Sequence, residues 1–302
     1  MAEISHRALR ELIESFGGCD EYFSEMINAS TLMSNGPFEK WYTDAGPCPE
    51  KVVFQIVGTD PVRIADAAGR LDQLPCRGID LNMGCPAPAI VRTGAGIRWM
   101  ESIDRAGALI ARVRPAVSHR LSVKLRIGLT DDFDYLLRFC RRLAAEGVDL
   151  ITLHPRTAKE KLKRSPRWNY VTHLRAELPI PVAGNGDIAN VPELLLRSGQ
   201  CDAVMIGRGA VRQPWIFAQA RHGTIPELNG QSISLQFLDL LELYQPPEFF
   251  LSRARRFFAF FCGNFTWAHY LNTLINREND HAGIIRVLST YFHENPEEML
   301  IP

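Results

Sequence analysis

A cysteine at the end of an apolar run is the first residue whose type and position could support chemistry. Cys85 follows residues 79–84 (Ile-Asp-Leu-Asn-Met-Gly) and precedes Pro86. The loop 93–96 (Thr-Gly-Ala-Gly) comes next, and its glycines allow the backbone to approach another group closely. A thiol presented at the carboxyl end of a strand can do chemistry, whereas an unreactive cysteine at a turn is a small hydrophobe. This stretch alone leaves both interpretations open.

Polar residues or glycines stand at the end of the later apolar runs as well. They are Gln55, Asn82, Lys124, Arg126 and His154, together with the turns Gly184-Asn185-Gly186-Asp187 and Gly207-Arg208-Gly209. In (β/α)8 enzymes the active site is built at the carboxyl ends of the strands. We therefore expect these residues to converge on one site.

The elements that must position these residues alternate between apolar runs and helical patterns. Strands are expected at residues 22–27, 52–58, 78–82, 121–127, 148–153, 180–183 and 203–206. Helices are expected at residues 61–71, 102–114, 131–146, 171–177 and 191–198, with short helices after Arg208 and Pro214. The runs look continuously apolar, which indicates a parallel sheet covered on both faces. This rhythm predicts an α/β fold, either a doubly wound sheet or the (β/α)8 TIM barrel that we favour.

The amino-terminal part of the predicted barrel is short by one strand. Residues 1–16 are expected to form one helix and residues 28–46 a long polar loop. Seven strands precede residue 207, whereas a TIM barrel needs eight. We therefore expect the first strand to be shortened or missing, with Met1 an internal methionine of a longer protein or the gene a truncated copy.

A helical region follows the barrel. Helices are expected at residues 233–244, 247–262, 266–277 and 282–292, with no further strand. The predicted domains are therefore a catalytic TIM barrel at residues 1–230 and a helical bundle at residues 231–302. Arg253, Arg255 and Arg256 form a basic group in this bundle, beside phenylalanines that are expected to fill its core.

Composition limits the kinds of partner and compartment. The 302 residues contain 34 Lys+Arg and 34 Asp+Glu, so any polyanion site must come from local clustering. One such cluster is the segment 156–167, which holds six cations and one acid and which we call the basic loop. The seven cysteines show no metal-ligand spacing, which indicates a reducing cytoplasm and no metal site. No signal peptide or long apolar run is present, so we expect a cytoplasmic protein without membrane spans.

Two features point to a flavin. Glycine-rich turns after the last two strands of such a barrel are the usual phosphate site, and Arg208 adds positive charge there. A lysine inside the barrel, Lys124, suits an electron-rich ring that gains negative charge. Together these features suggest flavin mononucleotide (FMN).

The chain resembles the tRNA-dihydrouridine synthases. The matching segments are 80–86 with 94–96, 123–126, 154–157, 184–187 and 207–209. They cover about residues 1–217 by motif, and Asn-x-Gly-Cys-Pro is the most specific of them. Pro155 stands where the family usually has glycine.

This resemblance implies roles for individual residues. Cys85 would protonate C5 of uracil while reduced flavin gives a hydride to C6, with NADPH or NADH as the electron donor. The implied flavin contacts are Met1, Gln55, Lys124, His154, Asn185, Gly186, Asp187, Gly207 and Arg208. The implied substrate contacts are Asn82, Arg126, Arg156 and Thr157. The basic loop and the bundle arginines would contact tRNA, and the protein is expected to be a monomer.

Two other functions stay open at this point. One is a flavin barrel that reduces a small molecule, although such a substrate needs neither a basic loop nor a helical domain. The other is an inactive, truncated homologue that only binds tRNA. The basic loop could also be a solvated lysine loop without a partner.

Overall fold

The computed structural model describes residues 1–223, 225 and 227–301. The chain divides into two compact units. The barrel unit comprises Glu21–Ile188 and Pro192–Gly207, and the helical unit comprises Met1–Asp20, Ala189–Val191 and Arg208–Pro302. The functional division at residues 230 and 231 stays a prediction.

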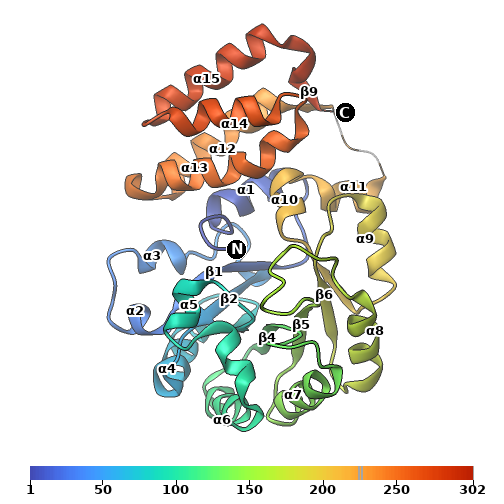
Figure 1. The fold of residues 1–302 in the computed structure, drawn as a ribbon. Helices are drawn as coiled ribbons and strands as arrows, with labels where there is room; N and C mark the ends of the chain where they lie inside the picture. Colours follow the sequence, from blue (N-terminus) through green and yellow to red (C-terminus); the bar gives the residue numbers. More distant parts are fainter. Residues whose placement is uncertain (224, 226, 302) are drawn as a thin grey trace. The chain divides into compact units, whose positions relative to one another are not determined.

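Seven parallel strands form the sheet of the barrel unit, in the order in which they occur along the chain (Figure 1). They are β1 (Tyr22–Asn28), β2 (Val52–Val57), β3 (Gly78–Met83), β4 (Arg120–Arg126), β5 (Leu150–His154), β6 (Val182–Asn185) and β7 (Ala203–Met205). Every predicted strand is therefore confirmed. In the described part of the chain, β1 and β7 are the edges of the sheet.

The sheet curls as a (β/α)8 barrel does. Arg120 at the start of β4 donates two hydrogen bonds to the carboxylate of Glu21, just before β1, at 2.6 and 2.5 Å. Two strands, β2 and β3, lie between β1 and β4 in the sheet. An ion pair across them requires the sheet to bend around its interior. The predicted fold class is confirmed.

Helices cover the outside of the sheet, as Figure 1 shows. They are α4 (Pro61–Asp72), α6 (Ile103–Val113), α7 (Phe133–Ala145), α8 (Trp168–Glu177) and α9 (Val191–Ser198). Asp60, Ser102 and Asp132 accept hydrogen bonds from the first backbone N–H groups of α4, α6 and α7, which fixes where these helices begin.

The strands are buried on both faces, but polar residues alternate with apolar ones along β3, β4 and β5. Asp80 and Asn82 on β3, and Ser122 and Lys124 on β4, share the inner face because side chains alternate across a strand. The outer face is apolar and packs under the helices. The description of continuous apolar runs therefore holds only for the outer face, because the inner face carries polar groups.

Short helices occur where the sequence predicted only loops. They are α2 (Ala29–Met33), α3 (Glu39–Tyr42), η1 (Pro49–Lys51), α5 (Pro88–Arg92), η2 (Gly96–Glu101) and η3 (Arg114–Ala116). The prediction of one long polar loop at residues 28–46 was wrong, because α2 begins there with Asn28 as its cap. Helices of one or two turns are too short to show an apolar period.

The helical unit has a core of aromatic side chains. Its helices are α1 (Arg7–Ser15), α10 (Arg208–Arg212), α11 (Ile216–His222), α12 (Gly230–Tyr244), α13 (Pro247–Phe261), η4 (Cys262–Asn264), α14 (Ala268–Arg277), α15 (His281–Glu294) and η5 (Pro296–Met299). Phe237 stacks on Phe257 with ring centroids 3.7 Å apart, and Phe257 stacks on Phe261. The predicted phenylalanine core is confirmed.

Three sequence expectations about the helical unit were wrong. The first helix begins at Arg7 rather than Met1 and packs on α12, where Arg7 lies over the Tyr244 ring. Two-residue strands β8 (Leu228–Asn229) and β9 (Leu300–Ile301) pair antiparallel, although no strand was expected. Arg253 is only 2% exposed and therefore cannot be a surface contact for RNA. No helix in the described residues is both long and apolar enough to span a membrane.

Candidate active site

The strand register gathers the predicted site residues on the inner face of the barrel. Asn82 on β3 is opposite Lys124 on β4, and Lys124 is opposite Thr152 on β5. One step nearer the carboxyl ends, Arg126 is opposite His154. Because all strands are parallel, these positions share one rim of the sheet, which is where barrel enzymes place their chemistry.

A chain of hydrogen bonds connects the inner face to the cysteine. Gln55 Nε2 donates to Asp80 Oδ2 at 2.8 Å, and Asn82 Nδ2 donates to Gln55 Oε1 at 2.9 Å. Asn82 Oδ1 accepts from the backbone N–H of Gly84 at 3.2 Å and from that of Cys85 at 2.9 Å. Cys85 is half-buried and follows the end of β3. Its backbone is therefore held by a side chain that itself belongs to the site.

The glycine loop approaches Cys85 closely from the other side. Ile97 N–H donates to the carbonyl oxygen of Cys85 at 3.1 Å. A Cβ on Gly96 would lie 2.6 Å from that oxygen, and Gly96 has a φ of +60°. Only glycine fits this contact without moving the cysteine.

We expect Gly96→Ala to destabilise the protein and displace Cys85. The new methyl group must push the Cys85 carbonyl away, which should lower the free energy of unfolding by about 1–3 kcal/mol. Gly94→Ala is the matched control, because Gly94 also has a positive φ (+88°) but its Cβ would meet only Thr59 Cγ2 at 3.6 Å. Urea denaturation of both variants measures the difference. Equal destabilisation would show that the backbone conformation, rather than the contact with Cys85, explains the glycine.

Lys124 has an unusual environment for a lysine. Burial lowers the pKa of its ammonium to about 8, although the nearby Asp80 carboxylate opposes that shift. Burial likewise raises the pKa of Asp80 to about 6, against hydrogen bonds from Ser122 and Gln55. Both groups therefore carry charge at pH 7, inside the barrel.

We expect Lys124 to lose its proton as the pH rises through about 8 in flavin-free protein. Lysines of ordinary acidity titrate near pH 10.4, roughly two units higher. NMR titration of the lysine Cε signals, assigned with Lys124→Met, measures the midpoint directly. A midpoint at the ordinary value would contradict the described environment.

Arg156 lies deep in the barrel unit rather than at its surface. Its side chain is 1% exposed, and its guanidinium makes two hydrogen bonds to Asp187, the first at 3.0 Å. Its Nη1 lies 3.2 Å from His154 Nε2. Arg156 thus ties the turn after β6 to the end of β5. Its predicted role as a substrate contact stays a prediction.

Arg126 and Thr157 form the base of the basic loop. Arg126 Nη1 donates to the carbonyl oxygens of Thr157 at 3.2 Å and Lys161 at 3.0 Å. Glu160, the one acid of the loop, accepts two hydrogen bonds from Arg167, which lower its pKa to about 2. The carboxylate is thereby neutralised within the loop. The exposed side chains that remain charged are Lys159, Lys161, Lys163 and Arg164.

The remaining predicted residues fall in both units. Asn185 ends β6 and donates to the Met205 carbonyl oxygen at 2.8 Å, and Gly186, Asp187 and Gly207 belong to the same barrel unit. Met1 and Arg208 belong to the helical unit, where Arg208 begins α10.

Sequence reasoning missed three inner-face residues: Asp80, Ser122 and Thr152. Asp80 and Ser122 each precede a predicted site residue by two positions, and Thr152 precedes His154 by two. The two-residue period of a strand places each on the same face as that site residue, and this signal could have found them.

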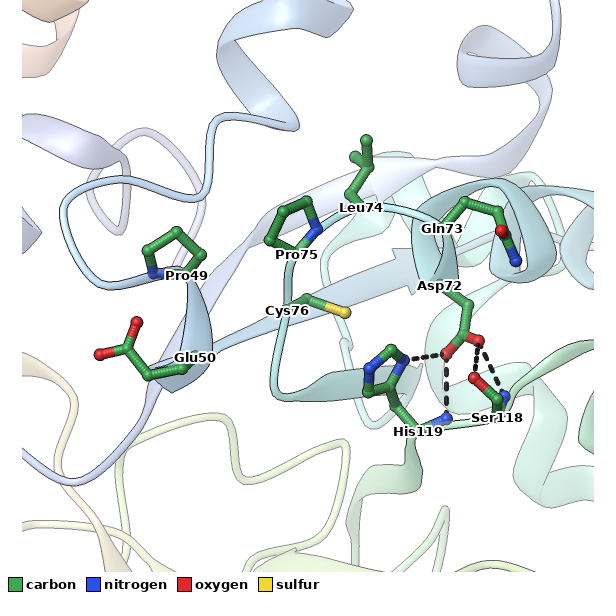
Figure 2. Close-up of a pocket in the computed structure, with 9 residues that line it drawn as sticks. All are labelled: Pro49, Glu50, Asp72, Gln73, Leu74, Pro75, Cys76, Ser118 and His119. Carbon is green, nitrogen blue, oxygen red and sulfur yellow. Dashed lines mark hydrogen bonds and ion pairs between the residues drawn. The ribbon is translucent and has the colours of Figure 1, made fainter.

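A cavity of about 620 Å³ lies at the opposite, amino-terminal ends of the strands (Figure 2). It is lined by residues that precede β2, β3 and β4, and Figure 2 shows Asp72 accepting hydrogen bonds from Ser118 and His119 beside Cys76. Burial raises the pKa of the Cys76 thiol to about 11. In a barrel this end serves stability rather than catalysis, so we place the active site at the other rim.

The fold and the polar rim define the class of the protein: a (β/α)8-barrel enzyme with its site at the carboxyl ends of the strands. A sequence profile described as dihydrouridine synthase (Dus) matches residues 1–242. The chain belongs to the dihydrouridine synthase family.

Individual relatives agree with that assignment. A probable tRNA-dihydrouridine synthase of Rickettsia conorii is 32% identical over 252 residues, which cover 81% of this chain and 75% of the relative. A tRNA-dihydrouridine(16) synthase of Ralstonia nicotianae is 29% identical over 235 residues, 73% of this chain and 71% of the relative. Among solved structures, histamine dehydrogenase from Rhizobium sp. 4-9 aligns with a TM-score of 0.54 at 12% identity, over 78% of this chain and 46% of its own. That likeness shows the fold alone.

Proposed function

We propose that this protein reduces the 5,6 double bond of specific uridines in tRNA to dihydrouridine, with FMN as the bound cofactor and NADPH or NADH as the electron source. The observation that carries the proposal is the inner-face group of Gln55, Asn82, Lys124 and His154 beside the exit that presents Cys85. The names of the family relatives give the substrate class.

The inner face suits a flavin. The ammonium of Lys124 makes no hydrogen bond with any residue that the structure describes, and the buried Thr152 hydroxyl opposite it also lacks a hydrogen-bond partner there. A cation and a hydroxyl facing a shared interior match the acceptor edge of a flavin ring, which gains negative charge on reduction. Gln55 and His154 would hold the ring, and Asn185, Gly186, Asp187 and Gly207 its phosphate arm. The roles of Met1 and Arg208 as flavin contacts stay predictions.

Two hydrogens are added to the uracil ring. Reduced flavin, when bound, supplies a hydride to C6. The thiol of Cys85 donates its proton to C5, so the carbon–carbon double bond becomes single, and the thiolate regains a proton from solvent. Asn82, which holds the Cys85 backbone, contacts the uracil. The target base must leave its stack to reach these groups.

The basic loop supplies the local positive charge that a neutral protein needs to bind RNA. Its exposed cations extend from a base that Arg126 fixes, and Arg126 is itself opposite His154 on the inner face. Phosphate contacts at this rim would place a tRNA over the site. A reductase of small molecules has no use for such a loop.

Mass spectrometry of tRNA from a strain that lacks the gene tests the proposed function. Loss of dihydrouridine at one or more positions, restored by the wild-type gene but not by Cys85→Ala, is expected. Unchanged tRNA modification would redirect the proposal to a small-molecule substrate, and purified protein without flavin absorbance would remove the oxidoreductase altogether.

A further inference from the structure

The chain of side-chain hydrogen bonds behind Cys85 begins at a carboxylate that sequence reasoning did not single out. Asp80 on β3 is completely buried. Its Oδ1 accepts from the Ser122 hydroxyl at 2.7 Å and its Oδ2 from Gln55 Nε2 at 2.8 Å. From Gln55 the chain continues to Asn82 and ends at the backbone N–H of Cys85.

The two ends of this chain determine how both amides point. An ionised carboxylate can only accept hydrogen bonds, and a backbone N–H can only donate. Gln55 must therefore turn its NH2 group to Asp80, which leaves its oxygen for Asn82. Asn82 must donate to that oxygen and turn its own oxygen to Cys85. Flipping either amide would bring two donors or two acceptors together.

We propose that Asp80 is a positioning residue, which fixes the orientation of Gln55 and Asn82 and thereby holds Cys85 in place at the end of β3. Asp80 acts through these neighbours and does not touch the substrate. The hydrogen-bond chain itself is a property of the fold, and its effect on tRNA reduction rests on the proposed function.

A buried carboxylate is an expensive way to fill space. Its charge is costly in a protein interior unless it is paired or hydrogen-bonded. Here Ser122 and Gln55 provide two hydrogen bonds, and Lys124 provides a nearby positive charge. A leucine of similar size would avoid that cost but would leave the Gln55 NH2 group without its acceptor.

The test uses three variants with different effects on the chain. Asp80→Leu removes the acceptor, so both amides are free to turn. Asp80→Asn keeps an acceptor oxygen for Gln55 while its NH2 group can donate to the Ser122 hydroxyl, so the orientation survives without the charge. Ser122→Ala is the matched control, because it removes a hydrogen bond to Asp80 on the side away from Cys85.

Hydrogen–deuterium exchange of the Gly84 and Cys85 amides gives the readout that does not depend on activity. In flavin-loaded protein we expect exchange about three- to tenfold faster in Asp80→Leu, the effect of losing one hydrogen bond. Exchange close to that of the wild type is expected in Asp80→Asn and Ser122→Ala. Wild-type exchange in Asp80→Leu would overturn the proposal.

Kinetics then connect the chain to the reaction. The rate at which tRNA reoxidises the reduced protein should fall about 10–100-fold in Asp80→Leu, since a small misplacement of a reacting group can have this effect. Asp80→Asn should recover at least tenfold of that loss. If Asp80→Leu does not fold, Gln55→Met breaks the same chain in its middle and should show the same faster exchange at Cys85; slow exchange there would overturn the proposal. An exchange result as expected in a wild type that reduces no tRNA would support Asp80 and reject the proposed function.

Discussion

Cys85→Ala is expected to lose about 10²–10⁴-fold in the rate of tRNA reduction, the usual contribution of a general acid. The reason is that Cys85 is the proton donor at the end of β3, held there by Asn82 and by the loop around Gly96. Reduction of the bound flavin by NADPH needs no thiol and should proceed at the wild-type rate. Stopped-flow absorbance separates the two half-reactions.

A matched variant distinguishes this role from a general effect of removing a cysteine. Cys48 is also half-buried, but it precedes β2 at the amino-terminal ends of the strands. Cys48→Ala should therefore reduce tRNA normally. Full single-turnover reoxidation by tRNA in Cys85→Ala would exclude the acid role.

Neutralising the basic loop is expected to weaken tRNA binding and flatten its salt dependence. Each phosphate contact contributes roughly 0.7–0.9 to the slope of log affinity against log salt. Replacing Lys161, Lys163 and Arg164 with glutamine should therefore lower the slope by about 2–3. The loop itself should survive, because its anchors are the backbone carbonyls of Lys161 and Arg164.

The control for this experiment carries the same change in charge at another place. Arg63, Arg112 and Arg141 are exposed on α4, α6 and α7, outside the barrel. Their replacement with glutamine should leave the slope nearly unchanged. A slope that falls equally in both variants would show non-specific attraction, and one that falls in neither would show that the loop is only solvated.

The sheet was predictable because its order follows the sequence and each strand is an apolar run between breakers. Residues 22–28, 52–57 and 120–126 illustrate this, with bounds close to those expected. The paired strands β8 and β9 were not predictable, because two residues show no period. The start of the first helix was misplaced for a different reason: residues 2–6 form turns, although their composition suits a helix.

The site was predictable where a residue type is unusual for its place, as with Lys124 in an apolar run or Cys85 before Pro86. It was not predictable where the meaning depends on a partner far along the chain. Asp80 gains its role from Gln55, 25 residues away. Arg156 looked like a free cation, but it is buried against Asp187, 31 residues away. Such pairs are set by strand register, which the sequence pattern does not specify.

The most direct test of the central claim is reduction of tRNA by the purified protein. Wild-type protein, FMN, NADPH and tRNA that lacks dihydrouridine are incubated, and the digested nucleosides are analysed by mass spectrometry. We predict that specific uridines gain two hydrogens with the wild type and not with Cys85→Ala. A wild-type protein that holds flavin and oxidises NADPH, yet leaves every uridine unchanged, would contradict the account.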